Sequence, residues 1–578
     1  MSDLIKRNKI LLAIIVIATI LRIWRIDQVP VSLFGDELDV GYHAYSILKT
    51  GKDYMGNSWP LHFHSLAEWR TPLYLYSAVP TVALFGISPL GVRLPAAIFG
   101  IANIWLLYLL VRELTKNQRV ACLSAFVLAV SPWHIQYSRA GFEVTQLLFF
   151  LLFGLLFFFK EIRRSSSSHG RWLWVASASF AFMPWVYSSA KLFVPILLLV
   201  LFLLWYKPLL KFKRQNLIKA LVALVVVGGP IAYSILFGGG AARFSYVGIF
   251  TDPTLEQEVG YARSQEAIAR GELGDGLVPT LKDRIYHNKF TFWGGTIAKN
   301  YLTSLSSSFL FSDGDPNPRH SITGMGMFYK VEFFALIAGV TLFFTSKYNW
   351  RYKVFMAFWI LGGVLPSALT RDGGNHATRL ILILPPLVVC IAYGISTFID
   401  KLPKQIAIWS LVLYGSFWVV LFLGYQDFYW VHNPRDSERW WHAGWQQAIQ
   451  AVKQHESEYD IVIVSTKGEP PWTFFAAWYA YPPEKWQKMN MPNTTKFLEG
   501  YGEISYIDKF YFGSPQNVVN IYDYGKVMKS GQLYLASADE VNVNLIREPD
   551  RTPGDLQLIE SIAYPSGEPA FYLFAKSE

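Results

Sequence analysis

Long apolar runs dominate the chain from residue 10 to about residue 425. A helix that crosses a bilayer needs about 20 mostly apolar residues. The runs therefore predict a polytopic α-helical membrane protein with about eleven spans. The expected spans are roughly 9–25, 91–111, 120–133, 143–159, 172–188, 190–206, 217–237, 328–345, 352–369, 379–400 and 405–425.

The charges between these runs predict their orientation, because cytoplasmic loops are rich in Lys and Arg. Lys6, Arg7 and Lys9 precede the first run, so we expect a cytoplasmic N-terminus. Every second loop is then basic, at 112–119, 160–171, 207–219, 346–353 and 400–405. The long loops 26–90 and 238–327 become external, and the proline-bearing stretch 72–87 is expected to lie at the membrane surface as a juxtamembrane helix. The protein is expected to be a multi-pass component of the cell membrane.

The composition changes from about residue 430, where charged residues, Asn and Pro become frequent and no further span follows. Helices are expected at 436–455 and 471–481, and strands at 460–466, 531–538 and 570–577. We therefore expect two domains, a transmembrane domain over 1–427 and a small soluble α/β domain over 428–578 on the external side.

Composition excludes several classes of protein. The chain has 578 residues, of which 52% are hydrophobic and only 16% charged, and the net charge is +10. The basic residues that explain this charge lie in the cytoplasmic loops, so no nucleic-acid partner is expected. The glycine-rich pieces GGGAAR and RDGGNH do not follow a soluble strand with phosphate-binding spacing, so neither ATP nor NAD is expected.

Polar residues gather on one side of the expected topology. Ionisable groups at a membrane boundary are costly and often mark a functional site. Those that fall in external segments or at external ends of spans are Asp36, Glu37, Glu68, Arg70, Arg139, Glu143, Arg243, His320, His376 and Arg379. External Arg and His run against the usual charge distribution, so they indicate a bound anion.

Each of these residues also has a structural interpretation. Asp36 and Glu37 begin a helix well, because carboxylates accept backbone N–H groups at the positive end of the helix dipole. Arg139 and Glu143 have the i,i+4 spacing of a simple helical ion pair, and Arg243 is in a glycine-rich loop where a plain loop arginine is equally reasonable.

The chemistry that fits a carboxylate beside anion-binding groups at the outer face is sugar transfer from a polyprenyl-phosphate donor. The carboxylate removes the proton of the acceptor hydroxyl, and the cations stabilise the departing phosphate. Two other classes remain open. A lipid-linked-sugar transporter would have its site near the midplane with repeat symmetry, and an O-antigen ligase or polymerase would lack the early acidic pair.

Five segments together resemble the GT-C glycosyltransferases, in particular the branch of the protein O-mannosyltransferases and lipid A aminoarabinose transferases. They are FGDELDVGYHAYSI (34–47), AEWRTPLYLY (67–76), GVRLPAAIFG (91–100), SPWHIQYSRAGFEV (131–144) and HATRLILILPP (376–386). The segment 131–144 has Glu143 where many relatives have Asp. The stretch after Glu68 lacks the charged-Pro-Pro sequence of the lipid A enzymes.

The resemblance implies a GT-C fold and roles for the candidate residues. Asp36 would be the general base of an inverting hexosyl or pentosyl transfer. Glu37 and Glu143 would orient a substrate, and a divalent ion such as Mg or Mn would be held by Asp36 and Glu143 if one is used. Glu68 and Arg70 would line the cavity. The lipid phosphate would be bound by Arg139, Arg243, His376 and Arg379, with His320 as a further substrate-binding residue. The acceptor would be a protein, lipid or glycan.

Overall fold

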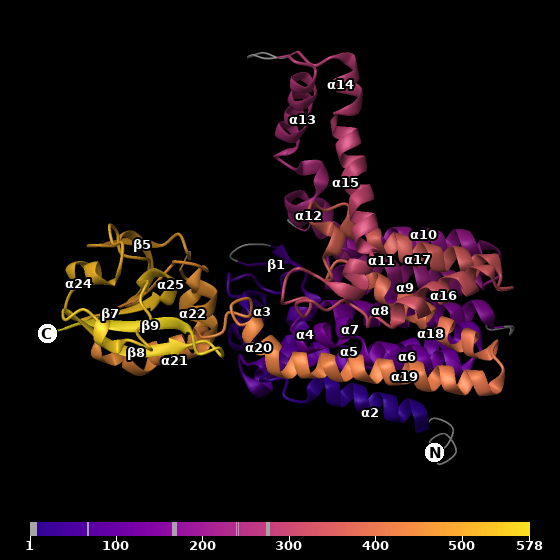
Figure 1. Cartoon of the computed structure of the whole chain (residues 1–578), viewed down its shortest axis with the longest axis horizontal. Coiled ribbons are helices and arrows are strands. Elements are labelled where there is room, and N and C mark those ends of the chain that lie inside the picture. The colour runs from indigo at the N-terminus through magenta and orange to yellow at the C-terminus, as the bar shows by residue number, and fades with distance from the viewer. Residues whose placement is uncertain are drawn as a thin grey trace.

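The computed structural model describes residues 9–65, 69–164, 170–238, 240, 242–272, 278–489 and 491–577. A bundle of helices occupies one end of the molecule and a β-sheet with its helices the other (Figure 1). An arm built from two antiparallel helices stands away from the side of the bundle. The main helices of the bundle are α2 (Lys9–Ile23), α5 (Pro89–Thr115), α6 (Gln118–Val130), α8 (Val144–Arg163), α9 (Leu173–Val186), α10 (Ala190–Leu209), α11 (Arg214–Phe237), α16 (Glu332–Thr345), α17 (Trp350–Ala368), α18 (Leu384–Asp400) and α19 (Lys404–Asp427).

Each apolar run expected to span the membrane contains one of these helices. By length and hydropathy, six helices of the described chain can cross a membrane, and a seventh can if α6 and α7 (Pro132–Arg139), bent by 56°, form one broken span. The apolar helices α9 and α16 are shorter, with 14 residues each, or about 21 Å at 1.5 Å per residue. The helical membrane protein is thus confirmed, while the count of eleven spans stays a prediction.

The first expected external loop folds into α3 (Gly35–Thr50), the two-residue strands β1 (Phe63–His64) and β2 (Trp69–Arg70), and α4 (Leu73–Phe85). α4 has 13 residues, too few to cross a bilayer as a straight helix. α4 covers most of the stretch 72–87, which the charge pattern predicts to lie at the membrane surface. The second long loop contains α12 (Ala242–Val247), α13 (Leu255–Ala269), α14 (Leu281–Tyr286) and α15 (Lys289–Ser304).

The C-terminal part contains a seven-stranded mixed sheet in the order β4-β5-β6-β3-β7-β9-β8. β3 is parallel to β6 and β7, and the other pairs are antiparallel. The strands are β3 (Ile461–Val464), β4 (Thr495–Leu498), β5 (Gly502–Ile507), β6 (Phe510–Phe512), β7 (Gln532–Ser537), β8 (Leu556–Ala563) and β9 (Pro569–Lys576). The helices are α20 (Asn433–Asp436), α21 (Trp445–His455), α22 (Pro471–Tyr479), α23 (Pro483–Trp486), α24 (Tyr524–Val527) and α25 (Ala538–Val541).

The helix expected over 436–455 begins later than its pattern indicated. Residues 437–444 form turns, and α21 starts at Trp445 after Gly444, whose φ of 89° is left-handed. Such a backbone favours glycine and interrupts a right-handed helix. The apolar stripe of Trp445, Ala448, Ile449 and Val452 is nevertheless buried as expected.

The sheet domain is packed directly against the start of the first loop. One buried cluster contains Leu38 and Tyr42 of α3 together with Trp445 and Phe474 of the sheet domain. The Tyr42 hydroxyl also donates to the backbone oxygen of Tyr481 at 3.0 Å. α3 is therefore held between the bundle and the sheet.

Candidate functional site

The acidic start of α3 presents its two carboxylates in different directions. Glu37 is fully buried, whereas the Asp36 side chain is 54% exposed. The Glu37 carboxylate accepts the backbone N–H of Phe34 at 3.4 Å, which caps the helix. Glu37 therefore caps the helix, whereas the carboxylate of Asp36 remains accessible to a substrate.

Arg70 of β2 links Asp36 to a third carboxylate. Its Nη2 lies 2.5 Å from Asp36 Oδ1, and its Nε lies 3.0 Å from Asp39 Oδ2. Asp39 is buried and accepts a hydrogen bond from the Tyr54 hydroxyl at 2.5 Å. Burial raises the pKa of Asp39, and Arg70 and Tyr54 oppose that rise. Sequence analysis did not select Asp39, although its i,i+3 spacing from Asp36 places both on one face of α3.

Glu37 does not face the substrate side as the sequence analysis expected. Its oxygens lie 2.7 and 2.9 Å from Arg93 Nε and Nη2, and it also accepts the Gly141 N–H at 2.6 Å. These partners inside the protein favour a structural role for Glu37 in the loop, and its expected role in orienting a substrate stays a prediction.

Arg139 is also fully engaged within the protein. It is buried, and its guanidinium donates to the backbone oxygens of Leu21, Trp24, Arg25 and Val29 and to the Tyr429 hydroxyl, at 2.8–3.2 Å. These carbonyls lie at and beyond the end of α2, where helix oxygens lack internal partners. These internal partners use the donors of the side chain and do not favour the expected contact between Arg139 and a lipid phosphate, which stays a prediction.

A pair of histidines lies beside a buried carboxyl. Asp315, His320 and His376 offer ligand atoms that all lie within 4.8 Å of one another. Burial lowers the pKa of His320 well below its usual value, with His376 and Arg319 adding to the effect, and burial raises the pKa of Asp315 to about 6. Neutral imidazoles and a carboxylate suit a transition metal. In the described part of the chain this is the one group of three or more such residues found, and it contains neither Asp36 nor Glu143, whose role as metal ligands stays a prediction.

A cavity of about 310 Å³ lies beside this cluster. Arg379 and Lys191 line it together with apolar residues that include Leu192, Ile235 and Leu369. The Arg379 guanidinium donates to Thr370 and Asp372 at 2.7 and 2.5 Å, and Lys191 donates to the Gly240 oxygen at 2.7 Å. Sequence analysis missed Lys191, although it follows an expected short external turn and breaks the same charge rule as the selected arginines.

Direct contacts bring Asp36, the histidine pair and the cavity into one region. The Arg319 guanidinium lies 4.9 Å from the ring of Phe34, two residues before Asp36, and the ring of the next residue, His320, lies 5.2 Å from that of His376. The backbone N–H of Arg379, which lines the cavity, donates to the His376 oxygen at 3.1 Å. The Tyr137 hydroxyl holds His320 Nδ1 at 3.0 Å and the Thr378 hydroxyl at 2.7 Å, which joins the loop before α16 to the loop before α18. Asp36, the histidine pair and the cationic cavity thus lie in one region of the protein.

The remaining expected residues are placed as follows. Glu143 is partly buried and lies just before α8. Glu68 lies outside the described residues. Arg243 falls in α12, but its side chain is outside the described part of the structure.

The sheet domain also reaches the site. The backbone N–H of Gly35 donates to His442 Nδ1 at 3.3 Å, and the other ring nitrogen of His442 lies 3.6 Å from Glu469. Arg319, which precedes His320, stacks over Phe34 and Trp440 at 4.9 and 5.8 Å. The residues flanking Asp36 are therefore contacted from both domains.

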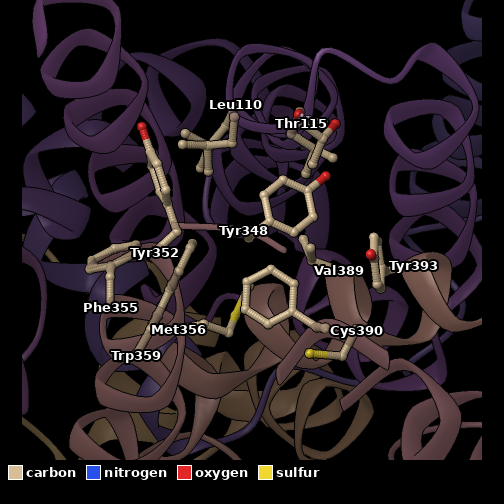
Figure 2. A pocket seen from close by; sticks show the side chains of 13 residues that line it. Leu110, Thr115, Tyr348, Tyr352, Phe355, Met356, Trp359, Val389, Cys390 and Tyr393 are labelled. Carbon is tan, nitrogen blue, oxygen red and sulfur yellow. Dashed lines mark hydrogen bonds between the residues drawn. The ribbon is translucent and has the colours of Figure 1, made fainter. Parts of the chain in front are cut away.

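A second pocket differs in character. Figure 2 shows a small pocket lined by Tyr348, Tyr352, Trp359, Met356 and other apolar or aromatic side chains. Its volume is about 50 Å³ and no charged residue lines it. None of the expected site residues lies there, and it offers no group for acid–base or phosphate chemistry.

Comparison with known proteins adds to this geometry. The family model of the dolichyl-phosphate-mannose-protein mannosyltransferases matches residues 70–233. The resemblance inferred from the motifs is therefore confirmed, and the signature is that of a glycosyltransferase. Two Bacillus subtilis proteins named as candidate mannosyltransferases, YkcB and YycA, are 29% and 26% identical over 34% and 33% of this chain. Each alignment covers only 27% of the relative's own length.

Solved structures extend the likeness to the whole fold. The structure of ArnT from Cupriavidus metallidurans bound to undecaprenyl phosphate has a TM-score of 0.50 and 10% identity, covering 98% of this chain and 97% of that one. The archaeal oligosaccharyltransferase AglB from Archaeoglobus fulgidus has a TM-score of 0.46 and 15% identity over 82% of this chain and 64% of that one. The match to ArnT shows a shared overall fold, which includes the parts of the chain before and after residues 70–233.

Proposed function

We propose that the protein is an integral membrane glycosyltransferase that moves a sugar from a polyprenyl-phosphate donor to an acceptor hydroxyl at the external face of the cell membrane. The observation that carries the proposal is the cavity with two cations and apolar walls, which lies in the same region as the exposed carboxylate of Asp36. A lipid phosphate needs this combination, because its headgroup is anionic and its tail apolar.

The phosphate would be held by Arg379 and Lys191. An arginine fork and a lysine ammonium both donate to phosphate oxygens. The partners they now have, Thr370, Asp372 and Gly240, lie at the cavity wall and fix the direction of each side chain. As the bond between the sugar carbon and the phosphate oxygen breaks, both cations stabilise the charge that develops on the leaving phosphate.

The acceptor would be activated by Asp36. Its carboxylate takes the proton of the acceptor hydroxyl while the acceptor oxygen forms the new bond to the sugar carbon. Arg70 orients the carboxylate through their ion pair. A single displacement of this kind inverts the configuration at the sugar carbon.

A divalent transition metal would be held by Asp315, His320 and His376. When bound, such an ion supplies positive charge near the donor phosphate. The two imidazole nitrogens favour Zn or Mn over Mg, which prefers oxygen ligands. The orientation of the chain, with a cytoplasmic N-terminus and an external sheet domain, is part of the same proposal, since both Asp36 and the cavity must face the side that holds the acceptor.

The proposal is tested with purified protein in liposomes that contain polyprenyl-phosphate mannose labelled in the sugar. Membranes from cells that lack the protein supply the acceptor, and the assay follows both the label transferred and the polyprenyl phosphate released. We expect equal amounts of the two products with the native protein and neither product with Asp36→Asn. Movement of the intact donor across the bilayer without transfer would instead identify a transporter. If mannose is not used, the same assay with pentosyl and other hexosyl donors identifies the sugar.

A further inference from the structure

The arm formed by α13, α14 and α15 has no role in the proposed site. Figure 1 shows that it stands out from the bundle across the direction of the spanning helices, near the end of the bundle that faces the sheet domain. α15 is rooted on the bundle, where Asn300 Nδ2 donates to the oxygens of Ala368 and Thr370 and the Ser304 hydroxyl donates to Gly374. A rod that crosses the spans at their external end extends along the plane of the membrane surface.

Several hydrogen bonds hold the helices of the arm together. Arg270 after α13 forms two hydrogen bonds with Asp283 of α14 at 2.8 and 2.9 Å. Arg263 of α13 donates to the backbone oxygen of His287 at 2.8 Å, and the Trp293 indole donates to Ile249 at 3.1 Å. The orientation of the far end relative to the bundle is thus set by several contacts between its helices.

The far end of the arm, residues 281–290, exposes large apolar side chains to an unusual degree. Leu281, Ile285, Tyr286 and Phe290 are 76, 58, 64 and 68% exposed. Single exposed apolar residues are ordinary, but four within ten residues form a patch that marks an interaction surface. We call residues 281–290 the arm tip.

The arm tip is also positively charged. Lys282, Arg284 and Lys289 alternate with the apolar residues, and the one carboxylate of this segment, Asp283, is already bound by Arg270. α13 has the opposite character, since Glu256, Glu258 and Glu266 are exposed on it. In Figure 1, α14 and α15 lie on the side toward the spans and α13 lies on the side toward the sheet domain.

We propose that the arm tip rests on the outer surface of the bilayer beside the bundle, with its apolar side chains among the lipids and its basic side chains on anionic phospholipid headgroups. Apolar residues interleaved with Lys and Arg are the pattern of helices that lie in a membrane interface. The basic side chains of the arm tip contact the lipid phosphates, and the acidic helix α13 is turned away from them. The membrane contact is independent of the proposed transfer reaction, because it rests on residues outside the site, and only its place on the outer side of the bilayer rests on the proposed orientation of the chain.

The test places an environment-sensitive fluorophore on the arm tip by labelling Phe290→Cys in purified full-length protein in phosphatidylglycerol nanodiscs. The background variant is Cys122→Ser, since Cys390 is buried and does not react. Lipids brominated in their acyl chains should quench the label by about twofold or more, as expected for a residue that enters the interface. The matched control is Glu258→Cys on α13, which should be unquenched by these lipids and accessible to iodide in the water.

Two further outcomes decide the inference. Exchange of phosphatidylglycerol for phosphatidylcholine, or the triple substitution K282E/R284E/K289E, should weaken the quenching at position 290. Equal quenching in all of these samples would overturn the headgroup contact. Accessibility of position 290 to iodide with no quenching by brominated lipid would overturn membrane contact altogether. A blue-shifted emission without lipid quenching would also overturn it, in favour of contact between two copies of the protein.

Discussion

Glu37 and Arg93 form a two-pronged ion pair in which neither side chain is exposed to solvent, with N–O distances of 2.7 and 2.9 Å. The Arg93 guanidinium also donates to the backbone oxygens of Ile26, Pro30 and Ser32. One buried pair therefore joins the start of α3, the start of α5 and the chain that leads out of α2. Because Asp36 is the residue next to Glu37, this pair fixes where the exposed carboxylate points.

Glu37→Gln is predicted to destabilise the protein. The substitution removes one charge and leaves the Arg93 guanidinium buried without its counter-ion, which costs about 3–5 kcal/mol in comparable cases. We expect a lower melting temperature in detergent and a parallel loss of activity. Glu548→Gln is a suitable control, since its ion pair with Arg551 lies at the surface with both side chains about half exposed and contributes little. An unchanged melting temperature would show that the pair is not structural.

Asp36→Asn is predicted to separate stability from activity. The side chain is half exposed and pairs with Arg70, so its neutralisation should change the free energy of unfolding by no more than about 1 kcal/mol. Loss of a general base typically lowers turnover by about 10²–10⁴-fold. The rate of sugar transfer and the affinity for polyprenyl phosphate are both measured. Near-normal transfer by this variant would exclude Asp36 as the base.

The contrast between Asp36 and Glu37 also shows how far sequence reasoning reaches. The pattern of apolar runs predicted a helix at each expected span, and the sidedness of charges identified Asp36, Arg70 and Arg379, which the structure brings into one region. The sequence alone could not distinguish an arginine that binds a ligand from one that caps a helix. Arg139 has the same external position as Arg379, and only the tertiary contacts show that its donors are used by α2.

Other features could not be predicted from the sequence, for a different reason. Asp315 is 62 residues from its hydrogen-bond partner Ala377, and no local spacing in the chain brings these segments together. The late start of α21 depends on the left-handed backbone at Gly444, which a hydrophobic stripe alone does not reveal. Lys191, by contrast, could have been identified from the sequence, because a lysine at an external turn breaks the positive-inside rule.

Arg379→Ala and Lys191→Ala are predicted to weaken donor binding. Each removes one cation from the wall of the cavity, and a charged hydrogen bond contributes about 1.5–3 kcal/mol, or roughly 10–150-fold in affinity. Binding of polyprenyl phosphate is measured directly in nanodiscs, without any acceptor. Arg371→Ala is the matched control, since Arg371 is in the same loop but does not line the cavity. Equal donor affinity in all of these variants would contradict the phosphate assignment.

Arg139→Lys is predicted to lower stability and leave the donor site intact in the protein that still folds. A lysine has three donors and no planar fork, so it cannot serve the four carbonyls and the Tyr429 hydroxyl that Arg139 now binds. A loss of about 2–4 kcal/mol in unfolding free energy is expected for a broken buried network. A selective fall in polyprenyl-phosphate affinity at unchanged stability would instead restore the original interpretation of Arg139 as a phosphate ligand.

The histidine pair yields the last prediction, which concerns metal content. Two imidazole nitrogens and one carboxylate within 4.8 Å of one another are sufficient for a transition metal with open positions for other ligands. We expect protein purified without chelator and dialysed against Zn or Mn to retain about one ion per chain, measured by mass spectrometry of the elements. His320→Ala combined with His376→Ala should abolish this retention. His432→Ala is the control, because His432 is half exposed and distant in sequence from the cluster. Retention of the ion by the double variant would place the metal elsewhere, and the histidines would then act only as neutral hydrogen-bond partners beside Asp36.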